Sequence, residues 1–496
     1  MFLLLVTAAC TTLGPHFGAK RDELFRRQVS SFVDRIRADP HAPPGFVVVA
    51  TTSNSVVFEG AHGMRDLATG APMTLDTPIY NASVTKAYTG LLASILDEEG
   101  VLPIGTSLAD VWPGLTLPDG LDADAITMGE LLAHTSRIRA GGLIFRSVTT
   151  GEVTAADVPT HLARYATARQ AGFSYSNTGP FIYSAAVEAR TAEPWRAALQ
   201  RHVLDPLGLS ETSASLEAFQ GESVAHCHGW ISGSWRSLRH KPTVTMNAAG
   251  GMYASGRDSA RFLQAFLSEG ASTGGRVSAT ALRQTWRRAA EQDNTLWGLH
   301  RDGYGLGWDL GERDGRRFVS RSGGYAGCRS MILFLPDEDF GIAVLSVGDA
   351  AANTFNAAIL RHAIDLWTSH PQVEQRAQSY LEEYAEAAEK EMARLAAAEA
   401  ALPPRAPVDT AYAQAVIGAY ENERLGRVGV ANENGQLVAF GGAFTADLLR
   451  VDGDRFLIVS RQEADDAQTF TFRRSIDGTV RDFLWDDDPY HRIMSK

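Results

Sequence analysis

Apolar residues in the first hundred positions recur with two different periods. Between residues 19 and 38, one helical face collects six large apolar side chains: Leu24, Phe25, Val29, Phe32, Val33 and Ile36. The β-branched runs at 46–50 and 56–58 flank a polar turn and predict a hairpin. Residues 83–99 return to the helical period, so the predicted order is helix, hairpin, helix.

The middle of the chain combines helical patterns with strands. Residues 103–240 mix short helices with Gly- and Pro-rich connections, which predicts a helical subdomain or long loops. Three apolar runs at 317–320, 331–334 and 342–345 are joined by short turns and predict strands, and a helical pattern follows them. Strands near both ends of residues 19–370 predict an α/β (α+β) domain with one antiparallel sheet flanked by helices.

The last quarter of the chain has a different pattern. Residues 371–404 are rich in Ala and Glu and predict a linker helix; a dimerising coiled coil is the alternative, although sustained heptads are missing. Proline residues at 403–407 mark a domain boundary. Residues 405–496 alternate short strands with Asn-Gly and Asp-Gly turns, which predicts a small all-β domain, a barrel or a sandwich.

The N-terminus carries a short apolar run followed by Thr7-Ala8-Ala9-Cys10. Small residues before a cysteine are typical of a bacterial lipoprotein signal, so residues 1–18 are predicted to be a signal region with a lipid anchor at Cys10. This interpretation places the protein in the periplasm or cell envelope. The run is short and no Lys or Arg precedes it, so a misassigned start and a cytoplasmic protein are the alternative.

Composition restricts the partners of this chain. The 496 residues carry a formal net charge of −12, which argues against a nucleic-acid backbone as ligand. Three cysteines are too few for a disulfide scaffold. No other segment reaches the roughly 18 consecutive apolar residues that a membrane span needs.

Candidate chemistry first appears at Ser83 and Lys86, where a hydroxyl and an amine are three residues apart at the start of a predicted helix. Side chains at this spacing share a helical face, so the amine can reach the hydroxyl. A serine becomes a nucleophile when a neighbouring base takes its proton, and a desolvated lysine is such a base. Because the spacing is common in surface helices, its context has to decide.

Two further stretches place polar residues beside glycines. The segment 173–179 sets Tyr175 and Asn177 two positions apart in a loop. The segment Arg321-Ser322-Gly323-Gly324 follows a predicted strand. Glycine has no side chain, so a substrate can approach the backbone closely there.

Together and in this order, the three stretches resemble the active-site set of the serine β-lactamase and penicillin-binding protein family. The Tyr-Ser-Asn element is similar to that of class C β-lactamases, D-alanyl-D-alanine carboxypeptidases, D-aminopeptidases and related esterases. Five other stretches also look like this family: 63–66, 131–136, 206–209, 249–252 and 304–308. The resemblance covers about residues 22–368 and implies a β-lactamase/transpeptidase-like fold.

The resemblance also implies roles for these residues. Ser83 attacks a carbonyl and becomes acylated, while Lys86 and Tyr175 share the proton transfers; which of the two is the base in each step stays open. Asn177 holds the amide or acyl group of the substrate. The N–H groups of Ser83 and Gly324 form the oxyanion hole. Neither a metal nor an organic cofactor is implied.

Arg321 departs from the family pattern, which usually has Lys or His at this position. A guanidinium stays charged and binds a carboxylate through two parallel hydrogen bonds. We therefore expect a substrate that carries a carboxylate near the scissile bond. The alternative is that Arg321 points away and pairs with an acidic side chain.

Other candidate sites are less well supported. Residues 270–274 fit the Gly-x-Ser-x-Gly pattern, but they follow a helix, whereas a nucleophile elbow follows a strand. His226-Cys227-His228 has no further ligands at a metal-binding spacing. His134 is typical of a structural hydrogen bonder rather than of a base.

The sequence thus predicts a serine hydrolase that cleaves an amide or ester of a small molecule or peptide through a Ser83 acyl-enzyme. Within that class it favours a D-amino-acid peptidase, a carboxypeptidase-like enzyme or an esterase. The alternatives are a true β-lactamase and a penicillin-binding receptor that is acylated but deacylates slowly.

Overall fold

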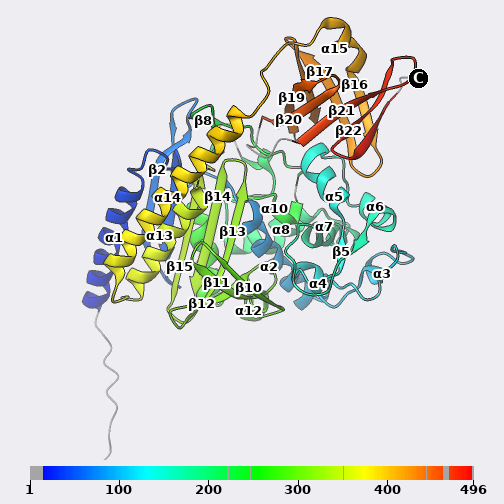
Figure 1. The fold of residues 1–496 in the computed structure, drawn as a ribbon. Helices are drawn as coiled ribbons and strands as arrows, with labels where there is room; N and C mark the ends of the chain where they lie inside the picture. The colour runs from blue at the N-terminus through cyan, green and yellow to red at the C-terminus, as the bar shows by residue number, and fades with distance from the viewer. Residues whose placement is uncertain are drawn as a thin grey trace, which may run out of the picture.

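The chain folds into a large α/β part and a smaller β-barrel (Figure 1). The computed structural model describes residues 15–219, 223–245, 247–349, 351–442, 444–461 and 468–493. Cys10 and most of the predicted signal region lie outside the described residues. No helix in the described ranges is both long enough and apolar enough to cross a membrane.

A nine-stranded antiparallel sheet lies at the centre of the large part, in the order β10-β11-β12-β13-β14-β15-β1-β2-β3. Its strands are β1 Gly45–Thr51, β2 Val56–Asp66, β3 Ala71–Pro72, β10 Ala290–Leu296, β11 Leu299–Tyr304, β12 Asp309–Arg313, β13 Arg316–Tyr325, β14 Cys328–Leu335 and β15 Phe340–Val347. The early hairpin joins the late strands through β1 and β15, with Val47 opposite Leu345. The predicted sheet, built from both ends of the domain, is confirmed.

Besides the two-residue β3, three of these strands have no counterpart in the sequence prediction. β10 has the sequence Ala-Glu-Gln-Asp-Asn-Thr-Leu, and its five central residues are all polar. β11 and β12 are similarly rich in charged residues. A strand is recognised in a sequence by alternating or continuous apolar residues, so strands of this composition give no such signal.

Three long helices cover one face of the sheet: α1 Pro15–Ile36, α13 Ala352–Trp367 and α14 Val373–Ala400 (Figure 1). The apolar face of α1 packs with β1 and α13 in one core. The stripe of α14 formed by Ala377, Tyr380, Tyr384 and Ala388 is buried in the same core. Because this chain itself covers that stripe, those residues of α14 present no free coiled-coil seam.

The other face of the sheet carries α2 Thr85–Glu98, α11 Gly256–Leu267, α12 Ala279–Thr285 and the helical subdomain. The subdomain has α3 Leu108–Val111, α4 Met128–Leu132, α5 Gly141–Phe145, α6 Asp157–Tyr165, α7 Thr178–Thr191, α8 Trp195–Leu199, α9 Asp205–Leu207 and α10 Asn247–Gly250. Tighter or wider turns occur at η1 Ala82–Val84, η2 Arg146–Thr150, η3 Gln200–Leu204, η4 Leu216–Ala218 and η6 Ala271–Thr273. Three two-stranded sheets complete it: β4 Ile79–Tyr80 with β9 Tyr253–Ala254, β5 Ile138–Arg139 with β6 Thr167–Ala168, and β7 His228–Ile231 with β8 Ser234–Ser237.

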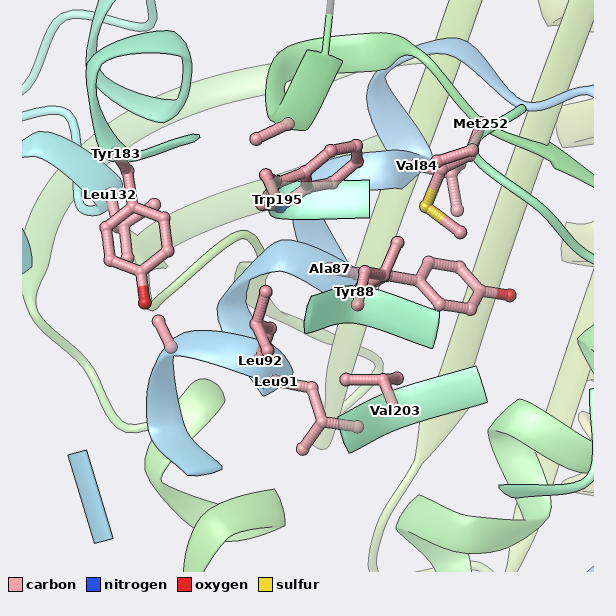
Figure 2. Packing of buried hydrophobic residues seen from close by; sticks show 14 of the residues in the cluster. Val84, Ala87, Tyr88, Leu91, Leu92, Leu132, Tyr183, Trp195, Val203 and Met252 are labelled. Atoms are coloured by element: carbon pink, nitrogen blue, oxygen red, sulfur yellow. The ribbon is translucent and has the colours of Figure 1, made fainter. Parts of the chain in front are cut away.

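Helix α2 is the most enclosed element of this face. Its residues 85–96 are all buried, and Figure 2 shows Tyr88, Leu91 and Leu92 among side chains of the surrounding helices. Gly307, at φ +90°, lets the 304–308 turn lie directly against the carbonyl of Lys86, where a Cβ atom would collide. A helix packed on all sides is a rigid base, so the residues at its first turn are held in fixed positions.

The C-terminal residues form a closed eight-stranded barrel preceded by α15 Thr410–Val416. Its strands are β16 Gly418–Asn422, β17 Gly426–Glu433, β18 Gln436–Gly441, β19 Phe444–Asp452, β20 Arg455–Ser460, β21 Gln468–Arg474, β22 Val480–Trp485 and β23 Asp488–Arg492. Its core combines aliphatic side chains with eight buried aromatic ones among the described residues. Phe145 of α5 packs edge-on against Trp485 of the barrel, at 5.2 Å between ring centroids. The predicted fold class, an α/β domain with a small all-β domain, is confirmed.

A disulfide joins Cys227, just before β7, to Cys328, the first residue of β14. The two residues are 101 positions apart in the chain, with Cα atoms 5.0 Å from each other. The sequence analysis did not pair them. Disulfides persist in oxidising compartments, which favours the predicted export; that localisation stays a prediction.

Candidate active site

Ser83 lies in the short turn η1, which leads directly into α2. The preceding residue, Ala82, has φ +43°, a left-handed conformation that costs a non-glycine residue energy. The turn is held by Ser330, whose Oγ donates to the carbonyl of Asn81 at 2.9 Å. Because η1 runs directly into α2, Ser83 lies at the N-terminal end of that helix, where the helix dipole favours negative charge.

Lys86 lies one turn further on and is 2% exposed. Its Nζ is 3.1 Å from Ser83 Oγ, and it also donates to Asn177 Oδ1 at 2.8 Å and to the carbonyl of Ala249 at 2.5 Å. Burial lowers the pKa of Lys86 to about 8; the negative charge that Tyr175 can carry opposes this shift, and the positive charge of Arg321 adds to it. An amine with this pKa is neutral in a useful fraction of molecules near neutral pH.

Tyr175 brings a second proton-transfer group to the site. Tyr175 as a whole is 43% exposed. Its hydroxyl nevertheless accepts a hydrogen bond from Nη2 of the buried Arg321 at 2.5 Å. Lys86 Nζ is 4.9 Å from the ring centroid. Burial by itself would raise the pKa of this hydroxyl, but the charges of Arg321 and Lys86 outweigh burial and lower the pKa below its usual value.

His134 positions the loop that carries Tyr175. The backbone N–H of Ser176 donates to His134 Nδ1 at 3.4 Å, so the ring proton is on Nε2, which is 3.2 Å from Tyr304 Oη. Burial lowers the pKa of His134 well below its usual value, and the charge of Lys86 adds to this. A neutral imidazole with both nitrogens occupied is a structural hydrogen bonder, as the sequence indicated.

Arg321 is 4% exposed and is bound mainly by protein groups. Its Nη1 donates to Asp309 Oδ2 at 3.1 Å and to Tyr304 Oη at 3.4 Å, and its Nε donates to the carbonyl of Ser83 at 3.3 Å. With the bond to Tyr175, these contacts leave one N–H of Nη2. A grip on a substrate carboxylate by two parallel bonds needs two N–H groups, so Arg321 would have to give up one of these partners to form it, and that role stays a prediction. Arg321 does pair with an acidic side chain, but it lines the cavity and does not point away from it.

Strand β13 brings Gly323 against the turn that carries Ser83. A Cβ atom on Gly323 would lie 2.9 Å from the backbone nitrogen of Ser83 and would collide with the carbonyl of Asn81. Only glycine permits this approach. Ser322 and Gly324, on either side, line the same cavity as Ser83 and Tyr175, so all residues predicted for the site are brought together around Ser83.

This cavity has a volume of about 620 Å³ and contains polar residues that the sequence analysis missed. One is Arg301 of β11, which is 5% exposed. Its Nη1 lies 3.5 Å from Oδ2 of Asp309, the carboxylate that also pairs with Arg321. Its Nε has no hydrogen-bond partner among the described residues. Arg301 and Tyr304 of β11 and Asp309 of β12 come from strands that the sequence did not predict.

The weaker candidates do not form sites. Residues 271–273 form the turn η6 after α11, not a strand-to-helix elbow. Cys227 is bonded to Cys328 and offers no thiolate. Within the described ranges, no group of three His, Cys, Asp or Glu residues could hold a metal ion.

Comparison with known proteins gives a consistent set of relatives. The family model described as Beta-lactamase matches residues 29–365. Penicillin-binding protein 4 of Amycolatopsis lactamdurans is 27% identical over 339 residues, which are 65% of this chain and 85% of that protein. The unguisins hydrolase ungD of Aspergillus violaceofuscus is 24% identical over 355 residues, 65% of this chain, and the chain spans 61% of that protein's length.

Among solved structures, the octameric penicillin-binding protein homologue from Pyrococcus abyssi has the same fold. The TM-score is 0.60 at 20% sequence identity, and the match covers 93% of this chain and 99% of that one. The likeness therefore extends through the barrel as well as the α/β part.

Proposed function

Starting from the fact that this chain belongs to the beta-lactamase family and is a serine hydrolase, we propose that it cleaves an amide or ester through an acyl-enzyme on Ser83. We propose a D-amino-acid peptidase, a carboxypeptidase-like enzyme or an esterase as the specific activity. One observation carries the proposal: the Nζ of a buried lysine whose pKa is lowered to about 8 lies 3.1 Å from Ser83 Oγ.

Acylation begins when Ser83 Oγ attacks the substrate carbonyl and gives its proton to the Lys86–Tyr175 pair. The oxygen of the tetrahedral intermediate accepts from the backbone N–H groups of Ser83 and Gly324, close to the positive end of α2. The pair then protonates the leaving amine or alcohol, the bond to it breaks, and the acyl group stays on Ser83.

Deacylation uses the same groups in the reverse order. Water enters the cavity, gives a proton to the pair and attacks the ester carbonyl. The bond to Ser83 breaks and Oγ recovers a proton, which releases the acid and restores the enzyme. Asn177 accepts from Lys86 through Oδ1, so its Nδ2 remains to donate to the acyl group of the substrate.

The proton transfers predict a pH dependence. Protonated Lys86 cannot take the proton of Ser83, and its pKa is lowered from the ordinary value to about 8. We therefore expect kcat/KM for an uncharged ester to rise with pH through one ionisation near pH 8. A profile that is flat between pH 6 and 10, after correction for spontaneous hydrolysis, would speak against Lys86 and Tyr175 as the proton carriers.

The charge at the base of the cavity favours a carboxylate-bearing substrate, with Arg301 as its partner. Arg301 and Arg321 share one carboxylate, Asp309, and Arg301 has a donor without a partner among the described residues. An Arg301→Gln variant should raise KM about tenfold or more for a free-acid substrate and leave the methyl ester of that substrate unaffected. Arg288→Gln, which removes an arginine of a different cavity, is the control; an equal change for acid and ester would contradict the assignment.

A substrate panel tests the proposed function. It contains p-nitrophenyl esters, D-alanyl anilides, D-Ala-D-Ala peptides and a chromogenic cephalosporin, each with the wild type and Ser83→Ala. Ser83-dependent turnover of an ester or D-peptide supports the proposal. Fast turnover of the cephalosporin alone points to a β-lactamase, and a persistent penicillin adduct without turnover points to a receptor.

A further inference from the structure

A second cavity, of about 800 Å³, lies between the α/β part and the barrel. Three elements enclose it: the β7–β8 hairpin, the last turns of α14, and strands β19 and β20. In Figure 1, α14 rises past β8 toward the barrel. The tip of the hairpin is fixed to the helix, because Ser232 Oγ donates to Glu399 Oε1 at 2.6 Å.

The barrel wall facing this cavity is apolar where a barrel exterior is normally polar. Phe456 and Ile458 of β20 point into the barrel core, so the alternating residues Leu457 and Val459 face outward and line the cavity. Leu449 of β19 is paired with Leu457, lines the same cavity and is 1% exposed. Strands whose outer face contacts water usually carry polar residues at outward-facing positions. The apolar residues at these positions in β19 and β20 therefore favour contact with apolar atoms.

The helix opposite presents a matching stripe. Leu395, Ala398 and Leu402 are spaced three and four residues apart, so they share one face of α14 and its continuation, and all three line the cavity. Ile231 of the hairpin adds a third apolar surface and is 39% exposed. The far end is closed by Asp447, which is ion-paired with Arg405 and Arg461.

The apolar cavity adjoins the catalytic one. Asp349, Arg394 and Leu395 line both cavities, and the catalytic cavity runs from Ser83 to the same segment of α14. A molecule whose carbonyl reaches Ser83 can therefore extend along β13 toward α14. A volume of this size accommodates an organic group of ligand dimensions.

We propose that the cavity between α14 and the barrel binds an aliphatic arm of the substrate that is cleaved at Ser83. This inference rests on the proposed function and adds the substrate class: amphiphiles whose scissile amide or ester is joined to an aliphatic chain. The small side chain of Ala398 leaves room for the aliphatic chain, and the surrounding leucine and valine side chains remove it from water.

The test compares two neighbouring alanines of α14. Ala398 lines the cavity, and Ala397, on another side of the same helix, does not. Ala398→Phe fills the cavity, whereas Ala397→Phe adds the same ring outside it. Two ester series are measured below their micelle concentrations: p-nitrophenyl alkanoates, with the chain on the acyl side, and alkyl esters of D-alanine, with the chain on the leaving side.

In the wild type, kcat/KM should rise with chain length in one of the two series. Full burial of each methylene corresponds to up to about fourfold. Ala398→Phe should make the increase in kcat/KM from the shortest to the longest ester at least about tenfold smaller. It should leave kcat/KM for the shortest ester unchanged, and Ala397→Phe should behave as the wild type. A flat dependence in both series, or equal dependence in both variants, would overturn the inference.

Failure of the proposed function would be visible separately, as absence of Ser83-dependent turnover of the shortest esters. In that case, calorimetric measurement of decanoate binding tests whether the cavity binds an aliphatic chain. Binding to the wild type and Ala397→Phe that is lost in Ala398→Phe supports the inference. Equal binding to all three proteins, or binding to none, overturns it.

Discussion

Ser83→Ala is expected to lower kcat for a short p-nitrophenyl ester by at least about 10³-fold, because it removes the nucleophile that forms the acyl-enzyme. Fold and stability should be preserved. Ser83 lies in a turn whose backbone is held by Ser330 and by packing against β13, and alanine fits there. The residual rate should approach that of the oxyanion hole and binding alone.

The control for this variant is Ser272→Ala. Ser272 belongs to the Gly-x-Ser-x-Gly pattern of residues 270–274, so it is the alternative nucleophile suggested by sequence, but it lies in a turn after α11. Its replacement should leave kcat/KM within about twofold, as for a surface substitution. Retained activity in Ser83→Ala together with loss in Ser272→Ala would reverse the assignment of the nucleophile.

Lys86→Met is the second change with a large expected effect. Methionine approximates the length of the lysine stem and removes the amine that lies 3.1 Å from Ser83 Oγ. General acid–base catalysis contributes about 10²–10⁴-fold, so kcat/KM should fall by about 10³-fold, and the rise near pH 8 should disappear. The variant should still fold, because an uncharged side chain replaces a buried amine that is costly to desolvate.

Circular dichroism and thermal unfolding check that the Lys86→Met protein is intact. Asn177 Oδ1 and the carbonyl of Ala249 lose their donor, so a modest decrease in melting temperature is expected. Lys86→Arg retains a donor but stays protonated, and it should be about as inactive as Lys86→Met. An arginine variant with wild-type kcat/KM would show that Lys86 acts as a charge and not as a base.

The sequence predicted the parts of the site that are close together in the chain. Ser83 and Lys86 share one helical turn, so their spacing indicates that the two side chains can meet. Tyr175 and Asn177 share one loop, and their roles follow from the resemblance to the family. Gly323 and Gly324 come after the strand predicted at 317–320, and the structure extends that strand, β13, through both of them. Each of these stretches has a local signal that does not depend on the remainder of the fold.

The environment of Arg321 had no such signal. Its partner Tyr304 is the last residue of β11, and its partner Asp309 is the first residue of β12. Both strands are too polar to be recognised as strands. The sequence gives no register for these strands, so it indicates neither the pairing of Arg321 with Asp309 nor the position of Arg301 in the cavity. Pairing between distant polar residues depends on the fold and not on a local pattern.

The disulfide and the second cavity illustrate the same limitation. Cys227 and Cys328 meet only because β14 runs beside the segment preceding β7. The outward apolar residues of β19 and β20 look like ordinary strand residues in the sequence, and only the position of α14 shows what they face. A disulfide or a cavity formed by two segments that are distant in the sequence can be recognised only when the fold is known.

The most direct test of the central claim is the intact mass of the enzyme after acid quenching within milliseconds of mixing with an activated ester, followed by peptide mapping. We expect a single acyl group on the peptide that contains Ser83; it should form in the wild type, form much more slowly in Lys86→Met and be absent in Ser83→Ala. Stoichiometric acylation of Ser83→Ala, or a wild-type adduct mapped to another residue, would contradict the central claim.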